Sequence, residues 1–543
     1  MLPVKLLPWP FSDGSGVTWW PQAATKRAAE VNVVSAARRS IVSSLIPFVV
    51  ATLGALVMAL AFPKTNASAL APIGTAGLFW AWFGVSPKRA FWIGWLAGTV
   101  YFAVNFAWFG ETAGALIAPF GFVLAVGPAL IEGLLGFGLT GALVAHMATG
   151  LRKRHRSVRA FVPLGCAAAF AFTEWLRAEG LGELGAPFAS LGYTQVATVF
   201  APVAAFAGTY GITFLLCVLG AYAAYALRMR PVRGSGVDAA IGVAAVAACA
   251  ALAFAFWPAR TYPAATVRVA AVQGDIPQSL KFAPGALAEA VERYTRLTLR
   301  LAHARVALVV WPETVIPAAV NQTPGLQSRF SALARKLNAE LVVGTLVVAP
   351  SGAYNVLEAF RTDGTLATVY RKRQLVPFAE HLPFRALLAW IPWTANISNF
   401  SEGNGDGLFG AAGLRFGPIV CWESAFTKIV NRDVDDGATA LVIATDDAWF
   451  GRTAGPYMHA QIAQMRALET GRWIVRAAST GISGIIAPDG RYVRASALGE
   501  TTIVTGKIGT PVNAPYAALG APAFAAFFAF MYIAVLIGAR RAT

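Results

Sequence analysis

Apolar runs of membrane-spanning length constrain this chain more than any other feature. A helix needs about 20 apolar residues to cross a bilayer core of roughly 30 Å, and eight runs are near that length. They lie at residues 41–62, 69–85, 90–109, 115–147, 158–176, 199–227, 239–257 and 516–539. Hydrophobic residues make up 57% of the chain and charged residues 13%, which is too apolar for a soluble protein. We therefore expect a membrane domain of about eight transmembrane helices.

Basic residues gather in alternate connections between these runs. Lys and Arg cluster at residues 88–89, 152–159, 228–233 and 540–541, whereas the connections between them are poor in both. By the positive-inside rule, both termini are predicted to be cytoplasmic and the long region before the last run to lie on the opposite side of the membrane, which in a diderm bacterium is the periplasmic side of the inner membrane. The net charge of +17 has the same origin, since the basic residues form no single patch for a nucleic acid.

The chain divides into four parts by composition. Residues 1–40 are a polar tail, predicted to be cytoplasmic, and residues 41–258 hold the first seven transmembrane helices. Residues 266–509 alternate short β-branched runs with helix-like segments, which predicts a complete α/β domain, and residues 516–539 form the eighth helix. Strands are expected at 267–272, 306–311, 340–348, 416–420, 441–445, 473–477, 484–487 and 502–508, helices at 286–302, 328–338 and 457–470, and hairpin turns at Asp363-Gly364 and Asp489-Gly490.

One cysteine stands apart from the other three. Cys166, Cys217 and Cys249 lie in apolar runs, where a free cysteine behaves as a small hydrophobe, and no disulfide framework follows from this distribution. Cys421 instead ends a β-rich run and begins a helix-like segment. A helix N-terminus favours an anion, so this position is expected to make the thiolate easier to form. Cys421 is therefore the candidate nucleophile.

Two more strand-end positions carry reactive groups. Trp311-Pro312-Glu313 places a carboxylate where a proline ends a strand. Arg371-Lys372-Arg373 places an ammonium group at a second strand end. Glu313 can act as a general base, although each motif alone also fits an ordinary surface charge. No His of this domain shares such a context, so a Cys–His pair is not expected, and no closely spaced His/Cys set indicates a metal site.

Five motifs of the α/β region resemble the nitrilase superfamily. They are Trp311-Pro312-Glu313, Lys372 with Leu375-Val376-Pro377-Phe378, Glu380, Cys421-Trp422-Glu423 and Asp447-Ala448-Trp449-Phe450-Gly451. Joined to a multi-span membrane part, they resemble the family of bacterial apolipoprotein N-acyltransferases over nearly the whole chain except residues 1–40. The resemblance implies a nitrilase-like αββα sandwich. It also implies a catalytic triad of Glu313, Lys372 and Cys421, with Glu380, Trp422 and Glu423 in support.

The resemblance also implies a reaction. A phospholipid donates an acyl chain to Cys421 as a thioester, and the α-amino group of a diacylglyceryl-cysteine on an apolipoprotein accepts it. Neither a cofactor nor a metal is implied, and a monomer is expected. Two rival functions remain open from the residues themselves. One is a membrane-tethered amidase or esterase that transfers the acyl group to water, and the other is a transporter with a large extracytoplasmic domain.

Aromatic residues are the expected substrate contacts. Phe282, Trp390, Trp393 and Trp449 are the candidates. The apolar segment 384–392 either forms a lid that dips into the membrane interface or packs in an ordinary core. Four residues depart from the family pattern and affect these contacts rather than the reaction class. Phe282 and Phe188 stand where the family more often has Trp and Pro-Trp, and Asp446 and Ser479 where it more often has Asn.

Overall fold

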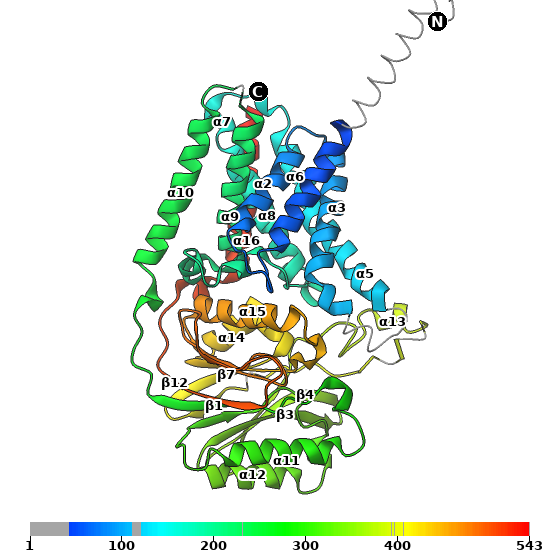
Figure 1. Ribbon diagram of the computed structural model, residues 1–543, viewed down its shortest axis with the longest axis vertical. Helices are drawn as coiled ribbons and strands as arrows, with labels where there is room; N and C mark the ends of the chain where they lie inside the picture. The colour runs from blue at the N-terminus through cyan, green and yellow to red at the C-terminus, as the bar shows by residue number, and fades with distance from the viewer. Residues whose placement is uncertain are drawn as a thin grey trace, which may run out of the picture.

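The computed structural model describes residues 43–110, 121–230, 232–391, 394–395, 397–405 and 407–541. The predicted tail at residues 1–40 and the candidate contact Trp393 lie outside these residues. The described chain has two parts, which Figure 1 shows one above the other. The upper part is a bundle of apolar helices, and the lower part is an α/β domain.

Each predicted apolar run contains a helix. The bundle consists of a helix at Ser43–Ala59, α2 (Leu70–Trp82), α3 (Pro87–Asn105), α5 (Gly121–Gly133), α6 (Leu139–Ala148), α7 (Arg156–Arg159), α8 (Val162–Trp175), α9 (Ala204–Arg228), α10 (Ser235–Ala255) and α16 (Pro515–Arg541). Among the described residues, four helices are long and apolar enough to cross a membrane: Val126–Lys153, Ala201–Arg228, Ser235–Ala255 and Pro515–Arg541. The count of eight spans stays a prediction.

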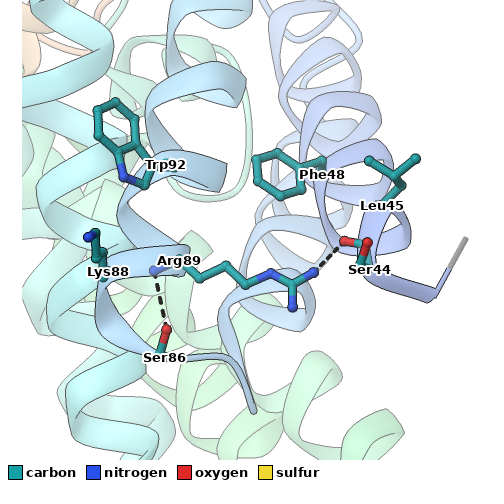
Figure 2. A pocket seen from close by; sticks show the side chains of 7 residues that line it. All are labelled: Ser44, Leu45, Phe48, Ser86, Lys88, Arg89 and Trp92. Atoms are coloured by element: carbon teal, nitrogen blue, oxygen red, sulfur yellow. Dashed lines mark hydrogen bonds between the residues drawn. The ribbon is translucent and has the colours of Figure 1, made fainter. Parts of the chain in front are cut away.

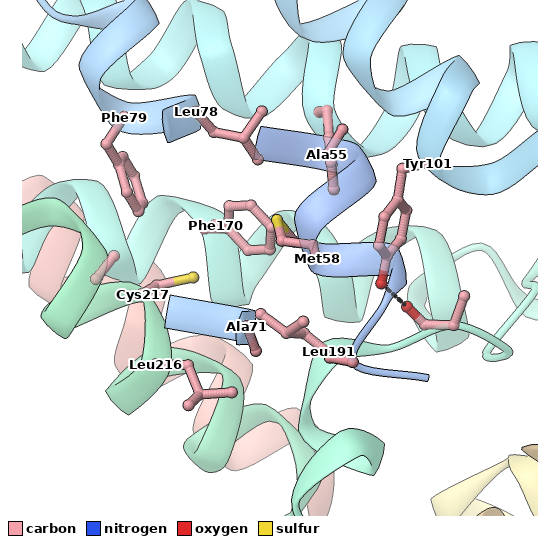
Figure 3. Close-up of a cluster of buried hydrophobic side chains, with 14 of the residues drawn as sticks. Ala55, Met58, Ala71, Leu78, Phe79, Tyr101, Phe170, Leu191, Leu216 and Cys217 are labelled. Carbon is pink, nitrogen blue, oxygen red and sulfur yellow. Dashed lines mark hydrogen bonds between the residues drawn. The ribbon is translucent and has the colours of Figure 1, made fainter. Parts of the chain in front are cut away.

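Small residues and aromatic rings fill the core of the bundle (Figure 3). Gly220 of α9 lies so close to α2 that a Cβ at this position would be 2.1 Å from Oγ1 of Thr75. Around this contact, Phe79 and Phe170 pack with ring centroids 6.2 Å apart. The hydroxyl of the buried Tyr101 donates to the Ala189 carbonyl at 2.8 Å. The polar end of this buried ring is thus satisfied by nearby backbone.

Basic residues of separate connections meet at the end of the bundle away from the α/β domain. Arg152 donates to the Arg228 carbonyl at 3.1 Å, and Arg540 contacts His146 at 2.9 Å. The C-terminus lies at the same end (Figure 1). A shallow pocket there, lined by Lys88 and Arg89 among others, separates α3 from the helix at Ser43–Ala59, as Figure 2 shows. This grouping agrees with a single cytoplasmic face.

The α/β domain is built on two six-stranded sheets. The first has the order β12-β1-β2-β3-β4-β5 and the second β11-β10-β9-β8-β7-β6. Their bounds are β1 Val267–Gln273, β2 Leu308–Val310, β3 Glu340–Ala349, β4 Gly352–Phe360, β5 Leu366–Arg371, β6 Phe409–Ala411, β7 Leu414–Val420, β8 Ala440–Thr445, β9 Trp473–Ala478, β10 Gly484–Ile486, β11 Tyr492–Ala495 and β12 Thr502–Ile508. Both predicted hairpin turns are confirmed, because Asp363-Gly364 joins β4 to β5 and Asp489-Gly490 joins β10 to β11.

Helices cover the outer face of each sheet. α11 (Ala286–Leu299) and α12 (Leu326–Leu337) pack on the first sheet, and α14 (Thr427–Asp435) and α15 (Gly455–Thr470) on the second. A separate apolar core lies between the sheets. This is the four-layer αββα sandwich that the sequence predicted. In both sheets three neighbouring strands run parallel, β1-β2-β3 and β7-β8-β9, so within each sheet the carboxyl ends of these strands lie at the same edge.

Buried polar contacts join the α/β domain to the bundle through α14 and α15, which lie between the two parts (Figure 1). Oε1 of Glu469 accepts hydrogen bonds from both the N–H and the hydroxyl of Thr209, each at 2.8 Å. Oε2 of Glu179 accepts likewise from Thr427, at 3.1 and 2.7 Å. Because buried carboxylates tolerate little misplacement of their donors, these contacts fix the orientation of the domain on the bundle.

Candidate active site

Glu313 is delivered by the end of β2. The strand is fully buried, and Pro312 interrupts its hydrogen bonding, so the chain leaves the sheet with the Glu313 side chain at its edge. Gly344 of β3 allows this close passage. A Cβ there would lie 2.0 Å from the Pro312 carbonyl oxygen and 2.7 Å from the Glu313 Cα. The position of the carboxylate is therefore fixed by the two strands beneath it.

Lys372 follows β5 and lies between two carboxylates. Its side chain is 1% exposed, and Nζ is 2.9 Å from Oε1 of Glu313 and 2.9 Å from Oε2 of Glu380. Burial alone lowers the pKa of a lysine. The two carboxylates outweigh burial here and hold the pKa of Lys372 well above its ordinary value. The buried side chain is therefore an ammonium ion at neutral pH.

Asn355 of β4 holds the two carboxylates in place. Its Nδ2 donates to Oε1 of Glu313 at 2.8 Å and to Oε1 of Glu380 at 2.9 Å. The second oxygen of Glu313 accepts from the N–H of Asp446 at 2.9 Å, and that of Glu380 from the N–H of Val376 at 2.8 Å. Each carboxylate is thus oriented by donors at both oxygens. The sequence analysis missed Asn355, whose only signal is an amide within the apolar strand β4.

Cys421 stands at the end of β7 with an unusual backbone. Its φ is +50°, in the left-handed region that non-glycine residues rarely adopt. The residue is 9% exposed. Its thiol interacts electrostatically with Glu313 and Lys372 and forms a hydrogen bond with the Thr445 hydroxyl. The structure thus brings together Glu313, Lys372 and Cys421, the three candidate catalytic residues predicted from the sequence.

The prediction that the Cys421 thiolate forms easily is wrong for the protein without substrate. The turn after Cys421 is a five-residue 3-10 helix, η11 (Cys421–Ala425), and α14 begins only at Thr427. Burial raises the pKa of the Cys421 thiol well above its ordinary value, and the Glu313 carboxylate raises it further. The short turn does not compensate for burial. Cys421 therefore needs a base to remove its proton.

Glu423 ties the two strand ends together. This fully buried carboxylate accepts from the N–H of Val420 at 2.7 Å, and from the N–H groups of Arg373 and Gln374 at 2.5 and 3.1 Å. It also accepts from the Tyr370 hydroxyl at 2.9 Å. One side chain thus links the chain just after Lys372 in the first sheet to the chain just before Cys421 in the second. Its hydrogen bonds therefore hold both strand ends.

The described aromatic candidates differ in exposure. Phe282 is 68% exposed, Trp390 is 78% exposed, and Trp449 is partly buried. Core packing of the segment 384–392 is therefore wrong for Trp390, as it is for the exposed Phe384 and Leu387 beside the short helix α13 (Arg385–Leu388). Trp422 instead stacks on Phe188 of the bundle, with ring centroids 5.2 Å apart and planes 12° apart.

The departures at Asp446 and Ser479 belong to one cluster. The Asp446 carboxylate pairs with the Lys281 ammonium, and its other oxygen accepts from the Ser479 hydroxyl at 2.5 Å. Asp446 also supplies the N–H that binds Glu313. Lys281 precedes Phe282, so the loop that carries this exposed ring is anchored beside the candidate base. The sequence gave no sign of this pairing, because 165 positions separate the two charges.

The arrangement fits nucleophilic acyl transfer. It brings an oriented carboxylate and a buried cation from the first sheet together with the thiol that follows β7 of the second, and these are the parts needed to deprotonate a nucleophile and to stabilise an oxyanion. Within the described ranges, no group of three or more His, Cys, Asp and Glu side chains is placed to hold a metal ion.

The need for a base leads to a test by alkylation. We expect Glu313→Gln to slow the reaction of Cys421 with iodoacetamide at pH 7 by about 10²-fold, because the buried thiol must then ionise unaided. The variant also lacks the Glu313 charge that raises the thiol pKa, but burial still raises that pKa, so the variant's rate should increase with pH as the thiol ionises.

Peptide mass analysis of the Cys421 segment measures this rate in the full-length protein. The matched control is Glu292→Gln on the exposed face of α11, which should react like the wild type. A Glu313→Gln protein that is alkylated at the wild-type rate at pH 7 would contradict the assignment of the base.

Comparison with known proteins covers both parts of the chain. Residues 268–512 match the carbon-nitrogen hydrolase family, and residues 54–222 match the apolipoprotein N-acyltransferase N-terminal domain. The chain is 33% identical to the apolipoprotein N-acyltransferase of Methylococcus capsulatus over 488 residues, which is 86% of this chain and 91% of the relative. It is also 33% identical to the enzyme of that name from Caulobacter vibrioides, over 83% of this chain and 86% of the relative. The chain therefore belongs to the apolipoprotein N-acyltransferase family, as a membrane-embedded member of the nitrilase superfamily.

Proposed function

We propose that this protein transfers a fatty acyl chain from a membrane phospholipid to the N-terminal α-amino group of a diacylglyceryl-cysteine on apolipoproteins. One observation carries the proposal. Cys421 lies beside the Glu313–Lys372 pair and also at the contact with an apolar helical bundle. A thiol nucleophile so placed is within reach of substrates that remain in the bilayer. The names of the relatives support lipoprotein N-acylation as the reaction.

The first half of the reaction forms a thioester. Glu313 takes the proton of the Cys421 thiol, and the sulfur attacks the ester carbonyl carbon of the phospholipid. The Lys372 ammonium and the N–H of Trp422 stabilise the oxyanion of the tetrahedral intermediate. As the intermediate collapses, the C–O bond breaks, and the proton on Glu313 passes to the departing lysophospholipid alkoxide. The acyl chain is then held on sulfur.

The second half transfers the acyl chain to nitrogen. The amine of the diacylglyceryl-cysteine attacks the thioester carbonyl and loses a proton to Glu313. The C–S bond breaks, the new amide leaves, and the proton returns from Glu313 to the Cys421 sulfur. Because the donor is already an ester and the oxyanion is held by preorganised charges, the steps need neither a metal ion nor a nucleotide.

Lys372 keeps its charge and position through both halves. Glu380 pairs with the ammonium, and Asn355 donates to both the Glu313 and the Glu380 carboxylates. When Glu313 becomes protonated, Glu380 still compensates the buried cation. In this proposal Glu380 is a positioning residue, and so is Glu423, which sets the distance between the Lys372 and Cys421 strand ends.

The position of the α/β domain suits substrates that stay in a membrane. The chain enters the domain from α10 and leaves it into α16, so apolar helices tether it at both ends (Figure 1). We infer that the basic end of the bundle faces the cytoplasm and that the α/β domain lies in the periplasm, at the surface of the inner membrane. The two termini are then cytoplasmic, and the active site opens at the outer leaflet.

The exposed apolar segment 384–391 is proposed as a lid. The helix α13 lies at the level where the α/β domain meets the bundle (Figure 1), and Phe384, Leu387 and Trp390, in or beside this helix, expose large apolar surfaces. Exposed aromatic rings at this level favour the headgroup region of a bilayer. The segment follows Glu380 closely in sequence, so its movement opens or covers the site. We propose the exposed Phe282, on the loop anchored by Lys281, as a further contact for the substrates.

Acyl transfer by purified protein tests the proposed function. Full-length protein with a phospholipid and a diacylglyceryl-cysteine lipopeptide should yield the N-acylated lipopeptide and a lysophospholipid, as measured by mass spectrometry. Cys421→Ala should abolish both products, whereas Cys249→Ala, at an exposed cysteine of α10, should leave the rate unchanged. Release of free fatty acid without any amide would instead support the amidase or esterase function. Full acyl transfer by Cys421→Ala would overturn the nucleophile.

The lid makes a separate prediction about donor size. Replacing Trp390 and Trp393 together by Ser should reduce acyl transfer from phospholipid about tenfold or more, because two anchoring rings are lost. Hydrolysis of a short soluble ester should stay close to the wild-type rate. Trp92→Ser, at an exposed ring of the bundle, is the matched control. Equal losses on both substrates would contradict the lid.

A further inference from the structure

A buried histidine lies behind the candidate nucleophile. His459 of α15 is almost fully buried, and its Nε2 is 3.2 Å from the carbonyl oxygen of Cys421 and 3.0 Å from the Ser424 hydroxyl. Its Nδ1 is 2.8 Å from Oδ1 of Asp447. The ring therefore contacts the backbone of Cys421 and not its thiol. This agrees with the sequence pattern, from which no Cys–His catalytic pair was expected.

The other side of the ring is held by a buried ion pair. Oδ2 of Asp447 is 2.9 Å from Nη2 of Arg476, and both side chains are fully buried. Burial opposes the charge of Asp447, but Arg476 and His459 outweigh it and keep the pKa of Asp447 below its ordinary value. The Asp447 carboxylate and the Cys421 carbonyl can only accept, so Nδ1 and Nε2 both donate, which is the imidazolium form of His459.

The carbonyl of Cys421 is held by two donors. The Ser424 hydroxyl donates to it at 2.8 Å, and His459 Nε2 donates at 3.2 Å. A positive φ at a non-glycine residue persists only where its surroundings hold it in place. The φ of +50° at Cys421 is such a case. Serine and histidine together fix the direction of this carbonyl.

Fixing the carbonyl also fixes the next N–H group. In a planar trans peptide, the N–H points opposite to the C=O. With the Cys421 carbonyl turned toward His459, the N–H of Trp422 points away from α15. The first N–H groups of a helical turn have no partner within the turn, and Trp422 is the second residue of η11. This N–H is the donor that the proposed reaction needs for its oxyanion.

We propose that His459 is a positioning residue that aims the Trp422 N–H at the oxyanion by holding the Cys421 carbonyl. This inference rests on the proposed acyl transfer. His459 touches neither the thiol nor the substrate, so it does not serve as the base. Its action is confined to the orientation of one peptide group. Asp447 and Arg476 keep the ring in the only direction that allows this contact.

Two reactions of the Cys421 sulfur can distinguish an effect on the oxyanion donor from a general disturbance of packing. Attack on an ester carbonyl generates an oxyanion, whereas alkylation by iodoacetamide displaces iodide from a saturated carbon and generates none. Both reactions need the thiol, its deprotonation by Glu313 and a folded site. The rate of thioester formation from phospholipid, followed by intact mass without an acceptor, is therefore compared with the rate of alkylation of Cys421.

We expect His459→Ala to slow thioester formation by about 10²-fold, the usual loss for one oxyanion donor. The alkylation rate should stay within about twofold of the wild type, since that reaction has no oxyanion to stabilise. His459→Gln, which retains a side-chain N–H donor, should recover at least part of the loss. His303→Ala, at an exposed histidine of the same domain, should change neither rate, and Glu313→Gln should lower both.

Parallel losses in both reactions would overturn the inference, because they would indicate damage to the whole site. An unchanged rate of thioester formation would overturn it as well. If His459→Ala does not yield folded protein, Ser424→Ala tests the same carbonyl, with a smaller selective loss expected. Failure of the wild type itself to form a thioester would be a failure of the proposed function, and it would be seen before any variant is compared.

Discussion

A lysine ammonium buried between two carboxylates is the interaction on which the rest of the site depends. A charge withdrawn from water is costly unless it is paired and its partners are themselves held. Lys372 meets this condition with Glu313 and Glu380, both oriented by Asn355. The pair and the amide all come from the first sheet. The nucleophile comes from the second, so catalysis depends on how precisely the two sheets are joined.

Buried polar groups make that joint. Glu423 links the strand ends that carry Lys372 and Cys421, and His459 orders the backbone of Cys421 from the opposite side. The same layer of the domain, α14 and α15, contacts the helical bundle through Glu469 and Glu179. The geometry of the site and its placement at the bundle therefore share one layer of structure. This layer explains how chemistry on a soluble-type fold is brought to lipid substrates.

Periodicity predicted the elements with a strong apolar pattern and missed those without one. β12 was predicted with the bounds it has, Thr502–Ile508, and the parallel strands within a residue or two at most ends. β4 was missed because Asn355 and Glu358 interrupt its apolar pattern. The fold explains both polar residues, because Asn355 donates to the distant Glu313 carboxylate and Glu358 accepts from Gln327. The motifs identified the three candidate catalytic residues. Burial raises the pKa of the Cys421 thiol, which is the reverse of the expected effect. Lys281 and His459 could not be predicted, because their partners are far away in the sequence.

We propose that Cys421 holds a lipid acyl chain with its carbonyl oxygen between the Lys372 ammonium and the Trp422 N–H. The most direct test is an electron cryo-microscopy map of the protein after incubation with phospholipid in the absence of an acceptor. The account predicts continuous density from the Cys421 sulfur into an acyl chain, with the thioester oxygen facing Lys372. Acyl density on another residue, or a thioester whose oxygen points away from both donors, would contradict it.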